Sequence, residues 1–347
     1  MRKNITIRNK NDSISVQFEK KSVKIIFFLS LLVLLAGVVG TGLGGTVISP
    51  MEVIRTILGI GSGEYDYIIQ TLRFPRVLVS LFVGAALGVS GVILQGIIRN
   101  PLASPDIIGI TGGASVTAVA FITVLGGTVS IKLLPLAAVT GAIIVSLLIY
   151  LLSWRSGVTP IRLVLIGIGM SAVMGAGTTF MLVMSPFFSA GKAYIWLTGS
   201  VYGATRGDVF IIGLVVLVVV PLVLYLAQSL NIQELGDNVA TGLGVTVQRH
   251  RFLLLLFSVL LAGVAVSIAG AIGFVGLIAP HIARKLVGRP FGSLIIVSAL
   301  TGSLLVFIAD LIARTVFYPL DIPAGIFTAG VGAPFFLYLL VKNRNQF

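Results

Sequence analysis

The topology of this chain turns on 32 residues, FLLLLFSVLLAGVAVSIAGAIGFVGLIAPHIA at 252–283. The run is interrupted only by Ser258, Ser267, Pro280 and His281. About 20 apolar residues in a helix cross a hydrocarbon core roughly 30 Å thick, so the run is too long for one ordinary span and short for two. Gly270, Gly273 and Gly276 predict a break in it. Two spans are therefore expected here.

The composition around this run is that of a membrane protein. The chain is 57% hydrophobic and only 10% charged, with a mean hydropathy of +1.10, whereas a soluble domain carries about 25% charged residues. Apolar runs of membrane length recur to the C-terminus, without the ten-residue alternation of a transmembrane barrel. We predict an all-α integral membrane protein, because helices satisfy their own backbone groups in the bilayer.

The positive charges favour ten spans with both termini in the cytoplasm. The predicted spans lie at about 25–47, 75–98, 107–127, 133–153, 163–184, 209–228, 252–271, 272–287, 292–316 and 324–341. Of the 24 Lys and Arg residues, this topology leaves seven outside, namely Arg55, Arg73, Arg76, Lys132, Lys192, Arg206 and Arg314. A single span over 252–283 would divide them 13 to 11, which fits the positive-inside rule less well.

Two parts of the chain are expected. Residues 1–24 form a basic cytoplasmic tail that rests near anionic lipid and is retained, since no signal-peptide cleavage site follows. Residues 25–347 form one domain of ten helices. The net charge of +13 does not indicate nucleic acid, because the cations gather at the ends of apolar runs as bilayer anchors do.

Several chemistries are excluded or disfavoured. The chain has no cysteine and only two histidines, so thiolate and histidine-rich metal sites are excluded, and no cofactor is expected. No G-x-x-x-x-G-K-[ST] motif occurs, so any use of ATP requires a partner. The spans carry few ionisable groups, which argues against an ion-coupled secondary carrier. Asp310 lies four residues before Arg314, and an ion pair and a direct transport role both stay open for it.

The sequence GVSG at 88–91 resembles the G-x-S-G motif of intramembrane serine proteases. Ser90 would be the nucleophile and His281 its base. The alternative is close helix packing by small residues on one face. That face would contain Gly84, Gly88 and Gly91.

Two polar segments are predicted on the cytoplasmic side. The longer reads LNIQELGDNVATGLGVTVQRH at 230–250, and its pattern predicts two short helices with breaks at Gly236 and Gly242. A loop longer than its connection requires is often functional, and this one offers a docking face. The other reads RNPLASPDIIG at 99–109, where prolines prevent a continuous helix.

Ordered blocks along the chain carry a family resemblance. They are LRFPR at 72–76, GAALGVSGVILQ at 84–95, RNPLASPDIIGITGGAS at 99–115, LNIQELGDNVATGLGV at 230–245, GAIGFVGLIAPHIAR at 270–284, ADLIAR at 309–314 and DIPAGIFTAGVGAPFFLYLL at 321–340. Over nearly its full length the chain resembles the permease subunits of bacterial ABC importers for iron–siderophore complexes and vitamin B12. The NPLASPDIIG segment looks more like the siderophore branch.

The resemblance implies a transport subunit without catalysis of its own, in the bacterial cytoplasmic membrane. Its implied partners are two ATPase subunits, a second permease subunit (identical or paralogous) and an extracytoplasmic substrate-binding protein. The cargo it implies is an iron–siderophore complex, with cobalamin or haem as the alternative. The exact ligand stays open, because the binding protein can do the selecting.

The resemblance also implies three functional sites. The residues that dock the binding protein match Arg73, Arg76 and Arg314, whose guanidinium groups suit carboxylates. The cytoplasmic gate matches Asn100, Pro101 and Leu102 with the loop around 155–162, where Pro160 stands at a position that can have a small hydroxyl residue in relatives. The segment that meets the ATPases matches about 230–243, including Glu234, Leu235, Gly236, Asp237, Ala240 and Leu243.

Overall fold

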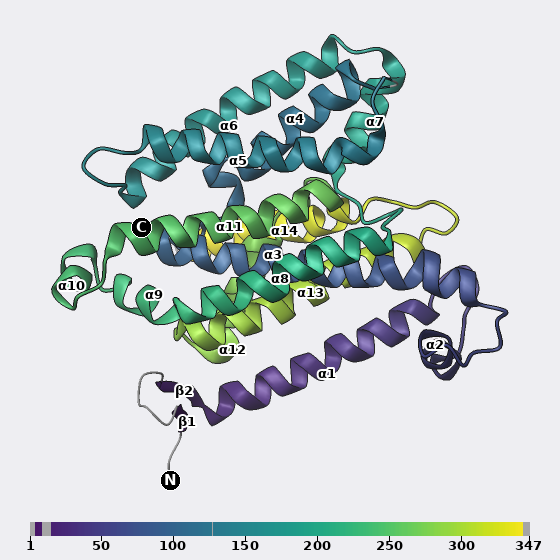
Figure 1. The fold of residues 1–347 in the computed structure, drawn as a ribbon, viewed down its shortest axis with the longest axis horizontal. Coiled ribbons are helices and arrows are strands. Elements are labelled where there is room, and N and C mark those ends of the chain that lie inside the picture. Colours follow the sequence, from purple (N-terminus) through teal and green to yellow (C-terminus); the bar gives the residue numbers. More distant parts are fainter. Residues whose placement is uncertain (1–3, 9–14, 127, 343–347) are drawn as a thin grey trace.

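The fold is a bundle of long helices, seen in a computed structural model that describes residues 4–8, 15–126 and 128–342 (Figure 1). The main helices are α1 (Lys20–Gly42), α3 (Phe74–Ile98), α4 (Ile110–Val124), α5 (Leu134–Leu152), α6 (Pro160–Val183), α8 (Arg206–Tyr225), α11 (Val247–Ala269), α12 (Val275–Val287), α13 (Phe291–Thr315) and α14 (Ala324–Lys342). Shorter helices are α2 (Pro50–Ile57), α7 (Phe187–Thr198), α9 (Ala227–Gln233) and α10 (Asp237–Gly242). Single turns are the π-helical η1 (Ile68–Arg73) and the 3-10 helices η2 (Pro105–Ile108) and η3 (Ile131–Leu133).

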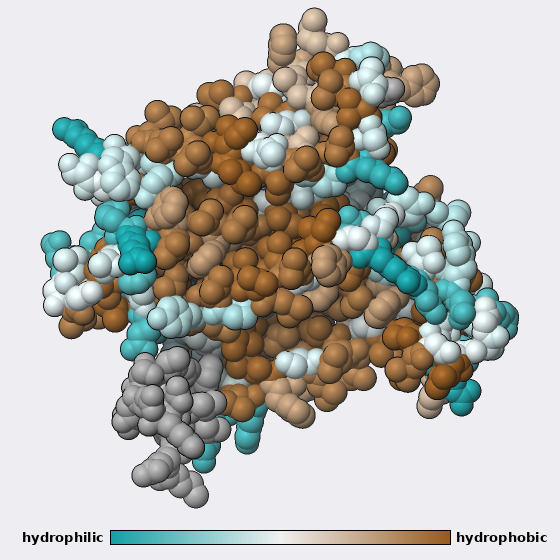
Figure 2. All heavy atoms as spheres, in the orientation of Figure 1, coloured by the Kyte–Doolittle hydropathy of each residue, from teal (hydrophilic) through white to brown (hydrophobic). Residues whose placement is uncertain are grey.

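The surface confirms a helical membrane protein. A broad apolar band separates polar groups at the two ends of the bundle (Figure 2). Eight helices of the described part are long and apolar enough to cross a bilayer. At 1.5 Å per residue, α4 and α12 reach only about 22 and 20 Å, because they have 15 and 13 residues. Ten crossings with both termini inside therefore remain a prediction.

The long apolar run at 252–283 is broken, as its glycines indicate. Helix α11 ends at Ala269, the backbone turns at Gly270 (φ 69°) and α12 begins at Val275. The break lies against the α7–α8 connection, where the Ser200 N–H donates to the Ala269 carbonyl at 2.7 Å. One continuous span over this run is excluded.

Helix α3 forms the centre of the bundle, and most of its residues are buried. Glycines bring its backbone against two neighbours. A Cβ atom on Gly84 would lie 2.1 Å from the carbonyl oxygen of Gly302 in α13, and one on Gly91 would lie 1.8 Å from that of Gly276 in α12. Gly88 is similar, with 2.4 Å to the Ser298 oxygen. Such contacts are possible only without side chains.

Helices α4, α5, α6 and α7 form a group of their own (Figure 1). It connects to the rest of the chain through the segments around η2 and before α8, and it packs on α11 mainly through α5. That packing is looser than the packing around α3. A Cβ atom on Gly263 of α11 would lie 3.4 Å from the Cβ atom of Ala142, which is an ordinary van der Waals contact.

The N-terminus differs from the expectation. Strands β1 (Asn4–Arg8) and β2 (Ser15–Glu19) pair antiparallel from Asn4↔Glu19 to Arg8↔Ser15, whereas no strand was predicted in the basic tail. Part of that tail, 1–3 and 9–14, lies outside the described residues. Helix α1 lies over 20–42 and not over the predicted 25–47.

The early end of α1 has a packing cause. A Cβ atom on Gly44 would lie 2.6 Å from the Arg73 guanidinium group, and one on Gly45 would lie 2.8 Å from the Tyr318 ring. The chain after Gly42 therefore packs closely against Arg73 and Tyr318 and does not continue the helix.

Candidate docking, gate and coupling sites

Arg76, in the first turn of α3, lies at the centre of an ionic network at the end of the bundle that carries α2. Its Nε atom donates to Asp310 at 2.9 and 3.2 Å, and its Nη2 atom donates to Asp321 at 2.8 Å. The guanidinium group also lies over the ring of Tyr202, 5.5 Å from the centroid. Arg76 is 8% exposed and Asp310 is 1% exposed, so this is a buried, shared ion pair.

Arg314 closes the same network from α13. Its Nε atom lies 3.5 Å from Asp310, so the ion pair expected from the four-residue spacing is present. Its Nη1 and Nη2 atoms donate to the carbonyl oxygens of Leu43 and Gly40 at 3.1 and 2.6 Å. These carbonyls end α1 and have no partner within the helix, and a cation is favourable there. Arg314 thus caps α1.

Arg73 is half-buried and also caps the end of α1. Its Nη1 atom donates to the carbonyl oxygen of Gly42 at 3.1 Å, and its Nη2 atom donates to the Thr46 carbonyl at 2.8 Å and hydroxyl at 3.0 Å. The three arginines predicted to dock a binding protein are therefore brought together, and each already holds acceptors of this chain. The spacing of the sequence did not reveal these acceptors.

A second ionic cluster lies at the opposite end of the bundle, on α10. The Nη2 atom of Arg251 donates to both carboxylate oxygens of Asp237, at 2.9 and 3.0 Å. Arg99, which follows the last residue of α3, donates to the same carboxylate. Arg251 is fully buried and also donates to the carbonyl of Val158, in the loop between α5 and α6.

These contacts set the charge state of Asp237. Burial raises the pKa of the Asp237 carboxyl, but the hydrogen bonds and charges of Arg251 and Arg99 outweigh burial, so that the pKa lies below its ordinary value. The carboxylate is ionised at neutral pH.

The residues of the predicted gate form a turn directly after Arg99. The side-chain oxygen of Asn100 accepts from the Leu102 N–H at 2.8 Å, and Pro101 lies between them. Leu102 packs against the cluster of Leu277, Ile278 and Leu339 on α12 and α14. The turn thereby connects the end of α3 to two other helices.

The predicted coupling segment contains two short helices, α9 and α10. Gly236 separates them with a φ of 114°, a conformation that L side chains rarely adopt. The second short helix, α10, ends at Gly242 as predicted, and the chain turns two residues later at Gly244, with a φ of 83°. Glu234, Leu235 and Leu243 are exposed and Ala240 is buried.

Comparison with known proteins decides the family. Residues 30–342 match the FecCD transport family. The chain belongs to the FecCD transport family. It is 50% identical to the achromobactin transport system permease protein CbrC of Dickeya dadantii, over 91% of this chain and 90% of that protein. It is 48% identical to the probable siderophore transport system permease protein YfhA of Bacillus subtilis, over 92% and 96%.

A solved structure of the same kind shares the fold. An inward-facing structure of a metal-chelate type ABC transporter superposes with a TM-score of 0.82 at 32% identity, covering 92% of this chain and 99% of that chain. The expectation of a transport permease is confirmed by these relatives.

The FecCD chain does not assemble the serine–histidine pair of a protease. The Ser90 hydroxyl lies 2.7 Å from that of Ser258 and donates to the Ser258 carbonyl at 3.1 Å. His281 instead lies beside Phe335, with ring centroids 5.4 Å apart. The nucleophile of the protease hypothesis therefore has another serine, and not the histidine, as its partner.

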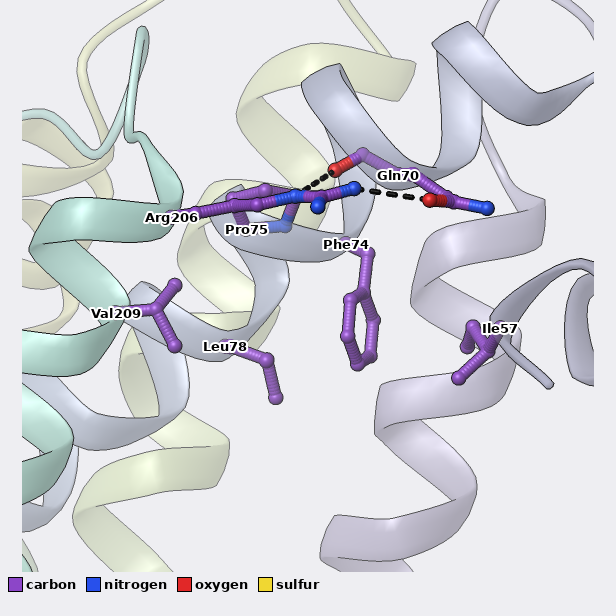
Figure 3. Close-up of a pocket in the computed structure, with 7 residues that line it drawn as sticks. All are labelled: Ile57, Gln70, Phe74, Pro75, Leu78, Arg206 and Val209. Atoms are coloured by element: carbon purple, nitrogen blue, oxygen red, sulfur yellow. Dashed lines mark hydrogen bonds between the residues drawn. The ribbon is translucent and has the colours of Figure 1, made fainter. Parts of the chain in front are cut away.

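A pocket of about 310 Å³ lies in the FecCD chain at the end of the bundle that carries Arg73 and Arg76. Arg206, at the start of α8, spans it and donates to the backbone oxygen of Gln70 at 3.2 Å and to its side-chain oxygen at 2.9 Å (Figure 3). The other lining residues are apolar: Ile57, Phe74, Pro75, Leu78 and Val209. Arg206 thereby fastens α8 to η1, next to Arg73.

Sequence reasoning missed several members of the two networks. Asp321 and Tyr202 lie in loops far in sequence from Arg76, and Arg251 lies in a basic stretch that resembles a membrane anchor. A signal was present for Arg251, because a cation one residue before a long apolar run is either at the lipid surface or paired. The sequence alone could not identify Asp237 as its partner.

Proposed function

We propose that this chain is the membrane permease subunit of an ATP-driven importer that carries an iron–siderophore complex across the bacterial cytoplasmic membrane. The observation that carries this is its 50% identity, over nine-tenths of both chains, to an achromobactin transport permease. Relatives named for ferric citrate, ferric hydroxamate and ferric enterobactin transport agree in cargo class. A cargo of cobalamin or haem is the alternative.

The proposed assembly has two permease subunits, two ATPase subunits and one binding protein. The α9–α10 segment supports the position of the ATPases. Leu235 and Leu243 are 65% and 62% exposed at a polar end of the bundle, and exposed apolar groups among polar ones are typical of interaction sites. The segment lies at the same end as the hairpin of β1 and β2 (Figure 1).

The binding protein is proposed to dock at the end that carries Arg73, Arg76 and Arg314. Of the carboxylates that hold Arg76, Asp310 is 1% exposed at its side chain and Asp321 is 38% exposed. A docking carboxylate would therefore replace Asp321 and leave Asp310 in place. The buried Asp310 keeps the guanidinium group oriented, while Asp321 is the exchangeable ligand.

The gate is proposed at Asn100, Pro101 and Leu102. The turn that they form supports this, because it joins the end of α3 to α12 and α14. The turn directly follows Arg99, whose side chain donates to Asp237 in the coupling segment.

Uptake by a reconstituted complex tests the function. The chain is co-expressed with its cognate ATPase and binding protein, purified, and placed in proteoliposomes. Ferric achromobactin, ferric citrate, a ferric hydroxamate, cobalamin and haem are offered in turn. We expect uptake of one of the ferric complexes that requires both ATP and the binding protein. Uptake of cobalamin or haem alone would establish the alternative cargo, and uptake driven by an ion gradient without ATP would contradict the importer.

A further inference from the structure

Arg99 has an unusual backbone conformation for its residue type. It ends α3 with φ 56° and ψ 33° in the left-handed region, where helix ends normally have glycine because a Cβ atom is unfavourable there. Of the described non-glycine residues, only Arg99, Ser156 and Phe274 have a positive φ. An arginine at this position therefore indicates that its side chain is needed.

That side chain binds the carboxylate of Asp237, to which the buried Arg251 also donates. One carboxylate thus joins the end of α3 to α10 and α11, and through Arg251 to the Val158 carbonyl in the loop between α5 and α6. We call Arg99, Asp237 and Arg251 the clasp.

The backbone alone connects α10 weakly to its surroundings. This six-residue helix lies between Gly236 and Gly244, both with positive φ, and no atom lies within 4 Å of where a Cβ atom would be on either glycine. Glycine permits the widest range of backbone angles. A displacement of α10 would be absorbed at these two residues unless a side chain carried it further.

We propose that the clasp transmits displacement of the coupling segment to the gate, with Asp237 and Arg99 as positioning residues. The route runs from α10 through the Asp237 carboxylate to Arg99, and then along the backbone to Asn100. This rests on the proposed function, in which an ATPase moves α9 and α10. Arg251 keeps the Asp237 carboxylate oriented toward Arg99. A displacement of that carboxylate then moves the end of α3.

Arg99→Gly is the sharpest test, because glycine suits the left-handed helix end better than arginine does. Arg99→Lys keeps the cation and serves as the matched variant. In proteoliposomes that contain the full transporter, we expect Arg99→Gly to bind the ATPase normally while the amount of ferric complex imported per ATP hydrolysed falls at least fivefold. Arg99→Lys should stay within twofold of wild type. If Arg99 only ends the helix, Arg99→Gly will import like wild type, and the clasp is refuted.

Asp237→Asn supplies a second test from the other side of the pair. It should also retain the ATPase and lose import per ATP, whereas Asp66→Asn, the same change at an exposed site at the opposite end, should have no effect. Loss of ATPase binding in Asp237→Asn would show that the residue acts in docking and would overturn the clasp. Failure of the proposed function is separate, since wild type itself would then show no ATP-dependent uptake.

Discussion

Arg76 and Asp310 join the first turn of α3 to the last turns of α13, with the Nε atom of Arg76 2.9 and 3.2 Å from the two carboxylate oxygens. Asp310 also lies 3.5 Å from Arg314, so one buried carboxylate serves two buried guanidinium groups. The three helices α1, α3 and α13 meet through it, because Arg314 holds the end of α1.

Removal of this carboxylate should destabilise the protein strongly. Asp310→Ala leaves two buried cations with one fewer partner, and breaking a buried ion pair from one side costs about 3–5 kcal/mol. We expect a clear fall in the melting temperature of the detergent-purified protein, measured by a thermal shift assay. Asp66→Ala, at an exposed site, is the control. Equal melting of the two variants would contradict the network.

Release of Arg76 from Asp321 should strengthen docking. The Nη2 atom of Arg76 lies 2.8 Å from both Asp310 and Asp321. Asp321→Ala removes the more exposed of these two carboxylates, so an incoming carboxylate no longer competes with it. We expect the binding protein to bind about tenfold more tightly, a change that needs only about 1.4 kcal/mol, and binding should weaken with added salt. Surface plasmon resonance on the reconstituted transporter measures both. Weaker docking in this variant would mean that Asp321 itself contacts the binding protein.

The glycine contacts of α3 predict a position-dependent response to one methyl group. Gly91→Ala places a Cβ atom 1.8 Å from the Gly276 oxygen, whereas Gly175→Ala in α6 places one where no atom lies within 4 Å. Gly91→Ala should therefore give little folded protein in size-exclusion chromatography. Gly175→Ala should be stable or slightly more stable, since alanine exceeds glycine by about 1 kcal/mol in a helix. Normal yield of Gly91→Ala would show that α3 and α12 are further apart.

The two glycines of the coupling segment should also differ. Neither has a neighbour within 4 Å, but Gly236 has a φ of 114° and Gly242 is helical. Gly236→Ala forces a strained backbone or a new orientation of α10, so we expect loss of ATPase co-purification and of substrate-stimulated hydrolysis. Gly242→Ala should retain both. The same result for the two variants would argue against an ATPase contact that depends on the angle between α9 and α10.

The sequence predicted those features that have a local signature. The break after Ala269 follows from glycines in an overlong apolar run, and the pair of Asp310 and Arg314 follows from helical spacing. The same spacing could not find Arg76, which is 234 residues from Asp310, because periodicity carries no information on distant partners. The end of α10 at Gly242 was predictable from glycine as a helix breaker, but which of the two nearby glycines takes the left-handed turn was not, and Gly244 takes it.

The site was predictable only in outline. Resemblance indicated Arg73, Arg76, Arg314 and Asp237 as functional residues, and their docking and coupling roles remain predictions. Their acceptors within the chain depend on tertiary packing, which a single sequence does not encode locally. The pairing of strands β1 and β2 in the basic tail was likewise missed, although NITIR and SVQFE both alternate polar and apolar residues as a half-buried strand does.

The backbone contacts of α3 restrict how this transporter can change shape. Where a carbonyl oxygen occupies the space of a missing Cβ atom, as at Gly84 with Gly302 and at Gly91 with Gly276, sliding or rotating one helix would bring side chains into the other's backbone. Helices α3, α12 and α13 must therefore travel as one rigid unit. The contact of Gly263 with Ala142 between α11 and α5 is looser, but α7 is fixed in the same way as α3, because the Trp196 and Thr198 carbonyl oxygens would lie 2.3 and 1.9 Å from Cβ atoms on Gly270 and Gly325. Any opening between α5 and α11 would therefore pivot about the end of α7.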